Sequence, residues 1–159
     1  MITYVKGDAT YPEKTTPNKM NLIVHVVNDA LKWGKGFVLA ISKRWSLPEY
    51  RFMTNYNPNP LGSFESVQVE KNVWVINLYG QHGIANKYIT IPPVRYDAIK
   101  KGLLSLRKLM CSRPNLYPLD NFAIHMPKIG CGLAGGDWSI VNRLVEDVFP
   151  DVDVYVYEP

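Results

Sequence analysis

Residues 126–138, Met-Pro-Lys-Ile-Gly-Cys-Gly-Leu-Ala-Gly-Gly-Asp-Trp, are the segment of this chain best suited to chemistry. Four glycines lie here between an apolar run, Phe122–Met126, and a helix that we expect to begin near Asp137. A glycine-rich turn from a strand into a helix presents backbone N–H groups to an anion, and the helix dipole favours the negative charge. Such turns also arise for steric reasons, so a phosphate cradle and a packing turn stand as equal alternatives.

A second segment, residues 25–37 (His-Val-Val-Asn-Asp-Ala-Leu-Lys-Trp-Gly-Lys-Gly-Phe), follows the same strand–glycine–helix plan. Asn28 stands at the predicted strand end, where its amide can donate to one sugar hydroxyl and accept from another. Gly34 and Gly36 permit a ligand to approach the backbone closely. The alternative is local: an Asx-turn at Asn28 and a packing role for Trp33.

Three titratable residues lie beside these segments. Asp137 either caps the following helix or serves as a catalytic or ribose-binding carboxylate at the mouth of a cleft. His25 lies in an apolar strand, where a histidine is more often a core residue, yet it is close to the strand end and to Asn28. Asp8 is either a simple turn residue or an acceptor for an exocyclic amine.

The elements that must position these residues alternate along the chain. We expect strands at Met1–Val5, Asn21–Val27, Phe64–Glu70, Asn72–Leu78, Phe122–Met126 and Val152–Tyr157, helices at Gly36–Trp45, Val94–Cys111 and Asp137–Phe149, and loops around Pro48, at 57–60 and at Gly80–Pro93. Near-continuous apolar strands interleaved with helices indicate an α/β fold with a largely parallel sheet between helices. Because ligands bind at the carboxyl ends of such strands, the two glycine segments should form two walls of one cleft.

The composition of the chain limits its domain number, its class and its possible ligands. The 159 residues suit one domain, 1–159, and 47% hydrophobic with 20% charged residues is ordinary for a globular protein. The sequence has no apolar run long enough for a membrane span and no signal-peptide pattern at its start. Cys111, Cys131 and three scattered histidines form no metal set, and two free thiols indicate a reducing, cytoplasmic location. The net charge of +4 suits an anionic ligand, but the dispersed Lys and Arg argue against nucleic-acid binding.

Three motifs together resemble the macrodomain family, which binds ADP-ribose. They are Lys-Gly-Asp-Ala-Thr at 6–10, Val-Asn at 27–28 followed by Trp-Gly-Lys-Gly at 33–36, and Ile-Gly-Cys-Gly-Leu at 129–133. The resemblance spans essentially the whole chain and implies a three-layer α/β/α fold with a mixed, mostly parallel central sheet. It implies that Asp8 contacts the adenine amino group and Asn28 the distal ribose. The other implied contacts, to the diphosphate and adjoining groups, come from Ala9, Trp33, Gly34, Lys35, Gly36, Phe37, Ile129, Gly130, Cys131, Gly132 and Leu133, and Tyr155 or Tyr157 is a loose match to an adenine-stacking residue.

Within that family the chain looks most like the small ADP-ribose 1″-phosphate phosphatases of yeast and phages. The resemblance rests on His25, Asn28, the 33–36 motif and Gly-Gly-Asp-Trp at 135–138. The related deacylating and ADP-ribosyl hydrolase branch uses a lysine after the middle strand and an aspartate directly after Gly-Cys-Gly-Leu. Here residues 79–81 are Tyr-Gly-Gln and the second position is Ala134, so a lysine-adduct mechanism is disfavoured.

The resulting hypothesis is a phosphomonoester hydrolase with His25, Asn28 and Asp137 near the terminal phosphate. Either Asp137 or His25 would activate water and the other would assist the leaving sugar oxygen. We expect a monomer with no metal and no cofactor. The alternatives are a hydrolase that removes ADP-ribose from modified macromolecules, and a module that binds ADP-ribose without turning it over.

Overall fold

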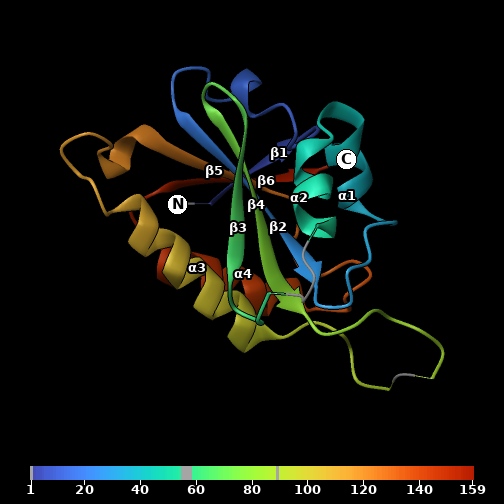
Figure 1. The fold of residues 1–159 in the computed structure, drawn as a ribbon. Helices are drawn as coiled ribbons and strands as arrows, with labels where there is room; N and C mark the ends of the chain where they lie inside the picture. The colour runs from blue at the N-terminus through green and yellow to red at the C-terminus, as the bar shows by residue number, and fades with distance from the viewer. Residues whose placement is uncertain (1, 55–58, 89) are drawn as a thin grey trace.

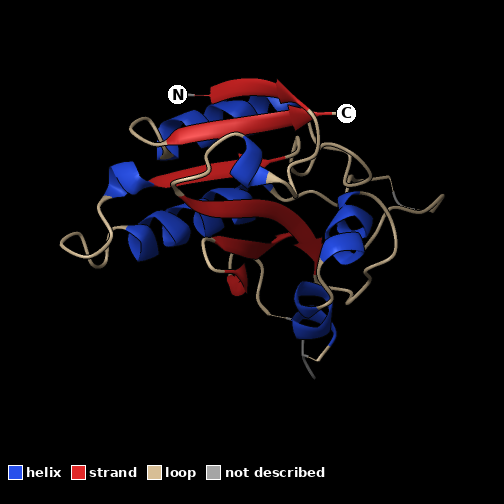
Figure 2. Ribbon diagram, turned by 90° about the horizontal axis from the view of Figure 1, so that it is seen from above, coloured by secondary structure: helices blue, strands red, loops and turns tan. Residues whose placement is uncertain are grey.

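The computed structural model describes residues 2–54, 59–88 and 90–159. Across these residues one sheet has six strands in the order β1-β6-β5-β2-β4-β3, and Figure 2 shows it from above as a twisted row. All neighbouring strands are parallel except β3 and β4, which are antiparallel. The strands are β1 (Ile2–Lys6), β2 (Met20–Asn28), β3 (Phe64–Glu70), β4 (Val73–Gln81), β5 (Phe122–Met126) and β6 (Asp153–Glu158). The predicted mixed, mostly parallel sheet is confirmed.

Helices cover both faces of this sheet (Figure 1). One face carries α1 (Phe37–Arg44) and α2 (Leu47–Met53), and the other carries α3 (Tyr96–Met110) and α4 (Trp138–Val148). Two short 3-10 helices, η1 (Pro12–Lys14) and η2 (Leu119–Asn121), precede β2 and β5. The described residues therefore form the three-layer α/β/α arrangement that the sequence predicts.

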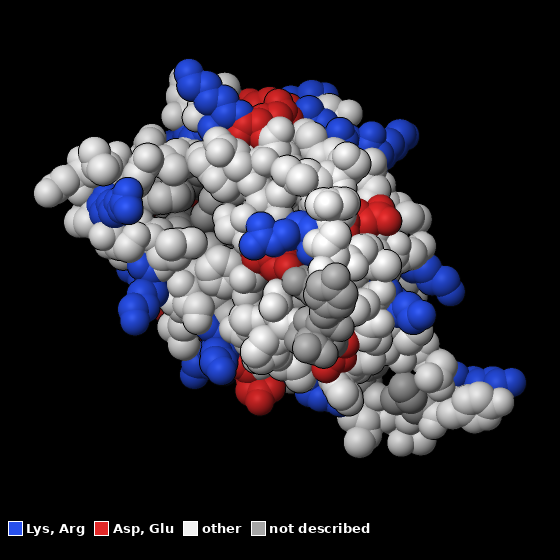
Figure 3. All heavy atoms as spheres, in the orientation of Figure 1, with Lys and Arg blue, Asp and Glu red and all other residues white. Residues whose placement is uncertain are grey.

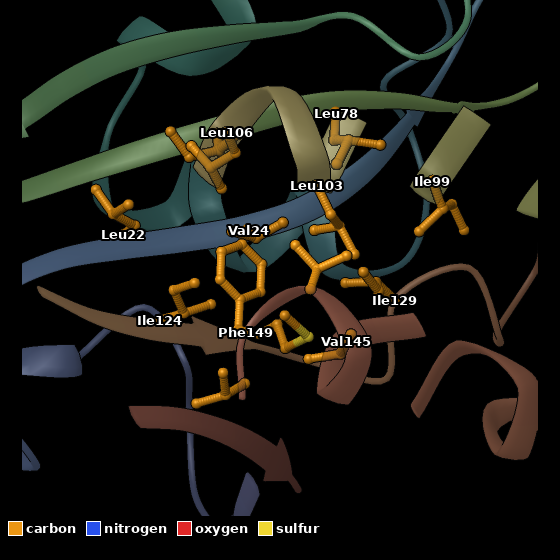
Figure 4. Close-up of a cluster of buried hydrophobic side chains, with 14 of the residues drawn as sticks. Leu22, Val24, Leu78, Ile99, Leu103, Leu106, Ile124, Ile129, Val145 and Phe149 are labelled. Carbon is orange, nitrogen blue, oxygen red and sulfur yellow. The ribbon is translucent and has the colours of Figure 1, made fainter. Parts of the chain in front are cut away.

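The apolar run of β2 is continuous because both of its faces are covered. Leu22 and Val24 pack into the larger core under α3 and α4, whereas Ile23 and Val27 face α1 and α2. Each such side chain, when fully buried, contributes about 1.5–3 kcal/mol. Figure 4 shows the larger core, where side chains of the helices and of the chain after α4 meet those of β2, β4 and β5; the labelled residues are Leu22, Val24, Leu78, Ile99, Leu103, Leu106, Ile124, Ile129, Val145 and Phe149.

Two local predictions were wrong, and each has a steric reason. Pro48 suggested a loop, but it lies in the first turn of α2, where the missing N–H would have no acceptor within the helix. Gly80 suggested the start of a loop, but β4 continues through it to Gln81. A Cβ at Gly80 would lie 2.8 Å from the Ile99 side chain, so this glycine admits α3 to the sheet. Met1, residues 57 and 58 of the loop predicted at 57–60, and residue 89 of the loop predicted at Gly80–Pro93 lie outside the described residues.

None of the helices in the described ranges has both the length and the apolar character required to cross a membrane.

Candidate functional site

A cavity of about 710 Å³ opens at the carboxyl ends of β2, β4 and β5. One wall is built by residues 25–28 and 31–38, and the other by 127–130 and 132–134. Met53 at the end of α2, Gln81 at the end of β4, and Ile84 and Ala85 after β4 complete the lining. The prediction that the two glycine segments form the walls of one cleft is thus confirmed. Parallel strands explain it, because their carboxyl ends all point to this edge.

The glycines of the two walls differ in how much space a Cβ atom would have at each of them. Gly130 has φ +71°, and a Cβ on Gly136 would lie 2.3 Å from the Gly130 carbonyl oxygen, so these two glycines serve the turn itself. Gly34 and Gly132 line the cavity with no positive φ and no atom within 4 Å of a built Cβ. Their missing side chains therefore leave bare backbone facing the cavity, as a ligand at close range would require.

The charge of the lining favours an anion. Lys32, Lys35 and Lys128 line the cavity, and the described lining residues include no carboxylate. Lys128 also pairs with Glu158 at 2.9 Å. On the face of the molecule in Figure 3, basic and acidic side chains are interspersed, so the basic groups form no continuous stripe there.

His25 faces this cavity from β2 and is 2% exposed. Its Nε2 lies 2.6 Å from Asn77 Oδ1, whereas its buried Nδ1 has no hydrogen-bond partner among the described residues. Trp33 meets the imidazole edge-on with ring centroids 5.4 Å apart, and Phe37 lies at 5.9 Å. Burial lowers the pKa of His25 to about 4, and the Asn77 hydrogen bond opposes this only in part. At pH 7 the imidazole is therefore neutral.

Asn28 organises the loop of the first wall. Its Oδ1 accepts from the N–H groups of Ala30 and Lys32, at 3.1 and 3.0 Å, and its Nδ2 donates to the Lys32 carbonyl at 2.8 Å. These bonds hold a turn in which Leu31 has φ +56°. The local Asx interpretation is thus present in the structure, and Asn28 also lines the cavity.

The same loop is tied to two neighbouring elements. The Trp33 indole N–H donates to Ser42 Oγ of α1 at 2.7 Å. Asp29 accepts from the Gly83 N–H and from His82 Nδ1, both at 2.7 Å. Burial raises the pKa of Asp29, but these hydrogen bonds and the His82 charge outweigh it, so the net pKa is lowered. The first wall is consequently a braced loop.

No model of a known protein family matches the chain. A solved structure of a macrodomain protein from Streptomyces coelicolor is 39% identical, has a TM-score of 0.79 and is matched over 100% of this chain and 99% of that one. The chain belongs to the macrodomain family.

Two curated relatives of this macrodomain are named as enzymes. An ADP-ribose 1″-phosphate phosphatase of Saccharomyces cerevisiae is 23% identical, with 99% of this chain and 98% of the relative covered. An ADP-ribose glycohydrolase of Homo sapiens is 24% identical, with 98% of this chain and 88% of the relative covered.

Most of the predicted site residues of this macrodomain line the cavity. They are His25, Asn28, Trp33, Gly34, Lys35, Gly36, Phe37, Ile129, Gly130, Gly132 and Leu133. Asp8, Ala9, Cys131 and Asp137 are not among the described lining residues. Ala9 is buried, and Asp8 accepts from the Thr10 N–H at 2.9 Å and the Thr10 hydroxyl at 2.7 Å. The predicted roles of all these residues stay predictions.

Asp137 is the N-cap of α4. Its carboxylate accepts from the Ser139 N–H at 2.9 Å and the Ser139 hydroxyl at 2.7 Å, and these bonds lower its pKa. Cys131, whose Sγ donates to the Ile129 carbonyl at 3.3 Å, has a pKa raised to about 11, chiefly by burial. The structure thus gives Asp137 a capping role, and it keeps Cys131 protonated.

Several residues in and around the site of this macrodomain escape sequence reasoning. Met53 belongs to α2, which the sequence presents as a loop. Asn77 contacts His25 from a neighbouring strand, and their separation of 52 positions in the sequence gives no motif that would reveal the contact. Lys32 and Lys128 carried a usable signal, because each lies within four residues of a strand end.

Proposed function

We propose that this macrodomain binds ADP-ribose and hydrolyses the terminal phosphate of ADP-ribose 1″-phosphate. The observation that carries the proposal is the cavity itself: Gly34 and Gly132 expose backbone on opposite walls and lysines line it. His25 is also a lining residue, and its buried Nδ1 has no hydrogen-bond partner among the described residues. The yeast relative named as this phosphatase supports the substrate.

The diphosphate would bind between the two glycine segments, with Lys32 and Lys35 balancing its charge. Residues 34–37 and 129–133 would provide the backbone donors. Asn28 would contact the distal ribose through its second amide hydrogen, since its oxygen already accepts two bonds. Asp8 and Ala9 would meet the adenine end outside the cavity described above.

His25 would act as the general base. Its Nδ1 takes a proton from water, the water oxygen bonds to phosphorus, and the P–O bond to the sugar breaks. The bonding electrons leave with the sugar oxygen, which takes a proton from solvent, so the products are inorganic phosphate and ADP-ribose. Because an adjacent anion favours the charged imidazolium, the arriving phosphate raises the pKa of His25 from its low value in the empty site.

Access to Nδ1 requires movement of an aromatic neighbour, since this atom is buried. Trp33 and Phe37 contact the ring, and they stand at the two ends of the Gly-Lys-Gly segment 34–36. We place the necessary adjustment in this segment. Asp137, which caps α4, would have to release Ser139 before taking part in catalysis.

The glycohydrolase relative favours the alternative of removing ADP-ribose from modified macromolecules. Against it, the positions that would carry the lysine and aspartate of that chemistry hold Tyr79–Gln81 and Ala134.

Cys111 and Cys131 are both free, which agrees with a reducing, cytoplasmic location. We also propose that the chain acts as a monomer.

The experiment that separates these functions compares products. The protein is incubated with ADP-ribose 1″-phosphate and, separately, with an ADP-ribosylated protein, and both phosphate and free ADP-ribose are measured. Our proposal predicts phosphate from the first substrate and no ADP-ribose from the second. Free ADP-ribose from the modified protein alone would establish the hydrolase instead, and binding of ADP-ribose with neither product would establish a binding module.

A further inference from the structure

A row of three polar side chains crosses the sheet behind His25. His25 of β2 stands directly opposite Asn77 of β4, and Asn77 stands directly opposite Glu65 of β3. All three are buried, with exposures of 2%, 0% and 4%. Strand register therefore brings together residues that lie far apart in the sequence.

The Asn77 amide has only one orientation compatible with its partners. Its Nδ2 donates to the Pro48 carbonyl at 3.2 Å and to Glu65 Oε1 at 3.1 Å. A backbone carbonyl can only accept, so the NH₂ group must face Pro48, and Oδ1 must face His25. The 2.6 Å contact then requires the proton on His25 Nε2. The Nδ1 atom is left with a lone pair.

We propose that Asn77 and Glu65 are positioning residues that hold His25 as the Nε2–H tautomer, with Nδ1 ready to accept a proton from water. This inference deepens the proposed phosphatase function and rests on it. Asn59 supports Glu65 by donating to Oε2 at 3.2 Å. In the opposite tautomer, the Nε2 lone pair would confront the Asn77 oxygen, which has no proton to offer.

Asn77 and Glu65 would also stabilise the protonated, charged form of His25. When Nδ1 takes a proton, Nε2–H becomes a charge-assisted donor to Asn77, and the Glu65 carboxylate lies one amide further away. Lys32 and Lys35 of its own wall and Lys128 of the opposite wall also line the cavity, while Trp33 and Phe37, which contact the ring, are uncharged.

The test reads the tautomer directly by ¹⁵N NMR of the imidazole and, separately, phosphate release from ADP-ribose 1″-phosphate. The variants are Asn77→Leu, Asn77→Asp and the pair Glu65→Leu and Glu65→Gln. Ser66→Ala is the matched control, because Ser66 is exposed on the same strand as Glu65. Thermal unfolding and ADP-ribose calorimetry accompany each variant.

We expect Nε2–H in the wild type and a mixture of tautomers in Asn77→Leu. Turnover in Asn77→Leu should fall ~10–100-fold with KM little changed, part of the ~10²–10⁴-fold that a general base contributes. Asn77→Asp should keep the tautomer and move the acid limb of the pH–rate profile to higher pH, because a carboxylate beside the ring favours its charged form. Glu65→Gln should retain more turnover than Glu65→Leu.

A wild-type protein with Nδ1–H would overturn the inference whether or not any variant folds, and so would an Asn77→Leu protein with unchanged tautomer and turnover. If the wild type shows Nε2–H, and Asn77→Leu disturbs it, while neither releases phosphate, the positioning is supported and the phosphatase function fails. The two ideas are therefore separable.

Discussion

Gly34 and Gly132 face the cavity from opposite walls, and a Cβ on either would have no neighbour within 4 Å. Neither has the positive φ that would require glycine in the empty protein. Replacing either by alanine should leave stability unchanged or raise it by about 0.4–1 kcal/mol, through lower entropy of the unfolded chain. ADP-ribose affinity should fall, because the methyl groups occupy the space of the diphosphate. Calorimetry and urea unfolding measure the two effects.

Gly136→Ala is the contrasting control. Its Cβ would lie 2.3 Å from the Gly130 carbonyl oxygen, so this variant should lose stability. Unchanged ADP-ribose affinity in both Gly34→Ala and Gly132→Ala would mean that the diphosphate does not lie between these walls.

Asp137 offers a test of capping against catalysis. Asp137→Ala should lower the free energy of unfolding, because the hydrogen bonds from Ser139 are lost. Asp137→Asn retains a good N-cap and should retain stability. Turnover per folded molecule should change little in both, since Asp137 is not among the described lining residues. A large loss of turnover in the stable Asp137→Asn protein would instead restore this carboxylate to the mechanism.

The brace on Trp33 should matter for ligand affinity. Ser42 accepts from the Trp33 indole and donates to Glu49 Oε1 at 2.8 Å, so it links the first wall to α1 and α2. Ser42→Ala leaves the indole N–H unpaired and loosens the loop, which must then be ordered on binding. We expect about a 5-fold weaker Kd for ADP-ribose, equivalent to the ~1 kcal/mol of one hydrogen bond. Ser105→Ala, on the exposed side of α3, should bind ADP-ribose with unchanged affinity. Equal affinities of the two variants would show that the hydrogen bond between Ser42 and Trp33 does not contribute to binding.

Two buried histidines predict how stability depends on pH. His125 on β5 bonds to Tyr157 and Asn21, both at 2.8 Å, and burial lowers its pKa to about 3. With the pKa of His25 at about 4, both imidazoles of the folded protein stay largely neutral between about pH 5 and 6.5, whereas the unfolded chain takes up protons below 6.5. The free energy of unfolding should therefore fall as the pH drops below 6.5.

At pH 5 the loss should be about 2 kcal/mol for each histidine, since one pKa unit corresponds to ~1.4 kcal/mol. Urea unfolding at pH 7.5 and pH 5 measures it. Equal free energies of unfolding at the two pH values would show that neither imidazole is buried as the structure has it.

The sequence carries enough information for the layers of the fold and for the location of the cleft. Phe122–Met126 is recognisable as a strand because it is an apolar run, and the structure buries every one of its residues. The cleft is located because both glycine segments follow strand ends. The α2 helix is missed because a proline looks the same in a loop and in a first helical turn. The contact of His25 with Asn77 depends on the register of β2 against β4, and the contact of Asn77 with Glu65 depends on the register of β4 against β3. No local pattern encodes either contact.

The most direct test of the central claim is inorganic phosphate release from ADP-ribose 1″-phosphate by the wild type and by His25→Ala. The account predicts release by the wild type and a loss of about 10²-fold or more in His25→Ala, the contribution of a general base. ADP-ribose should still bind the variant, since His25 makes no bond to the diphosphate in the proposed complex. Equal release by the two proteins, or binding without any release by the wild type, would contradict it.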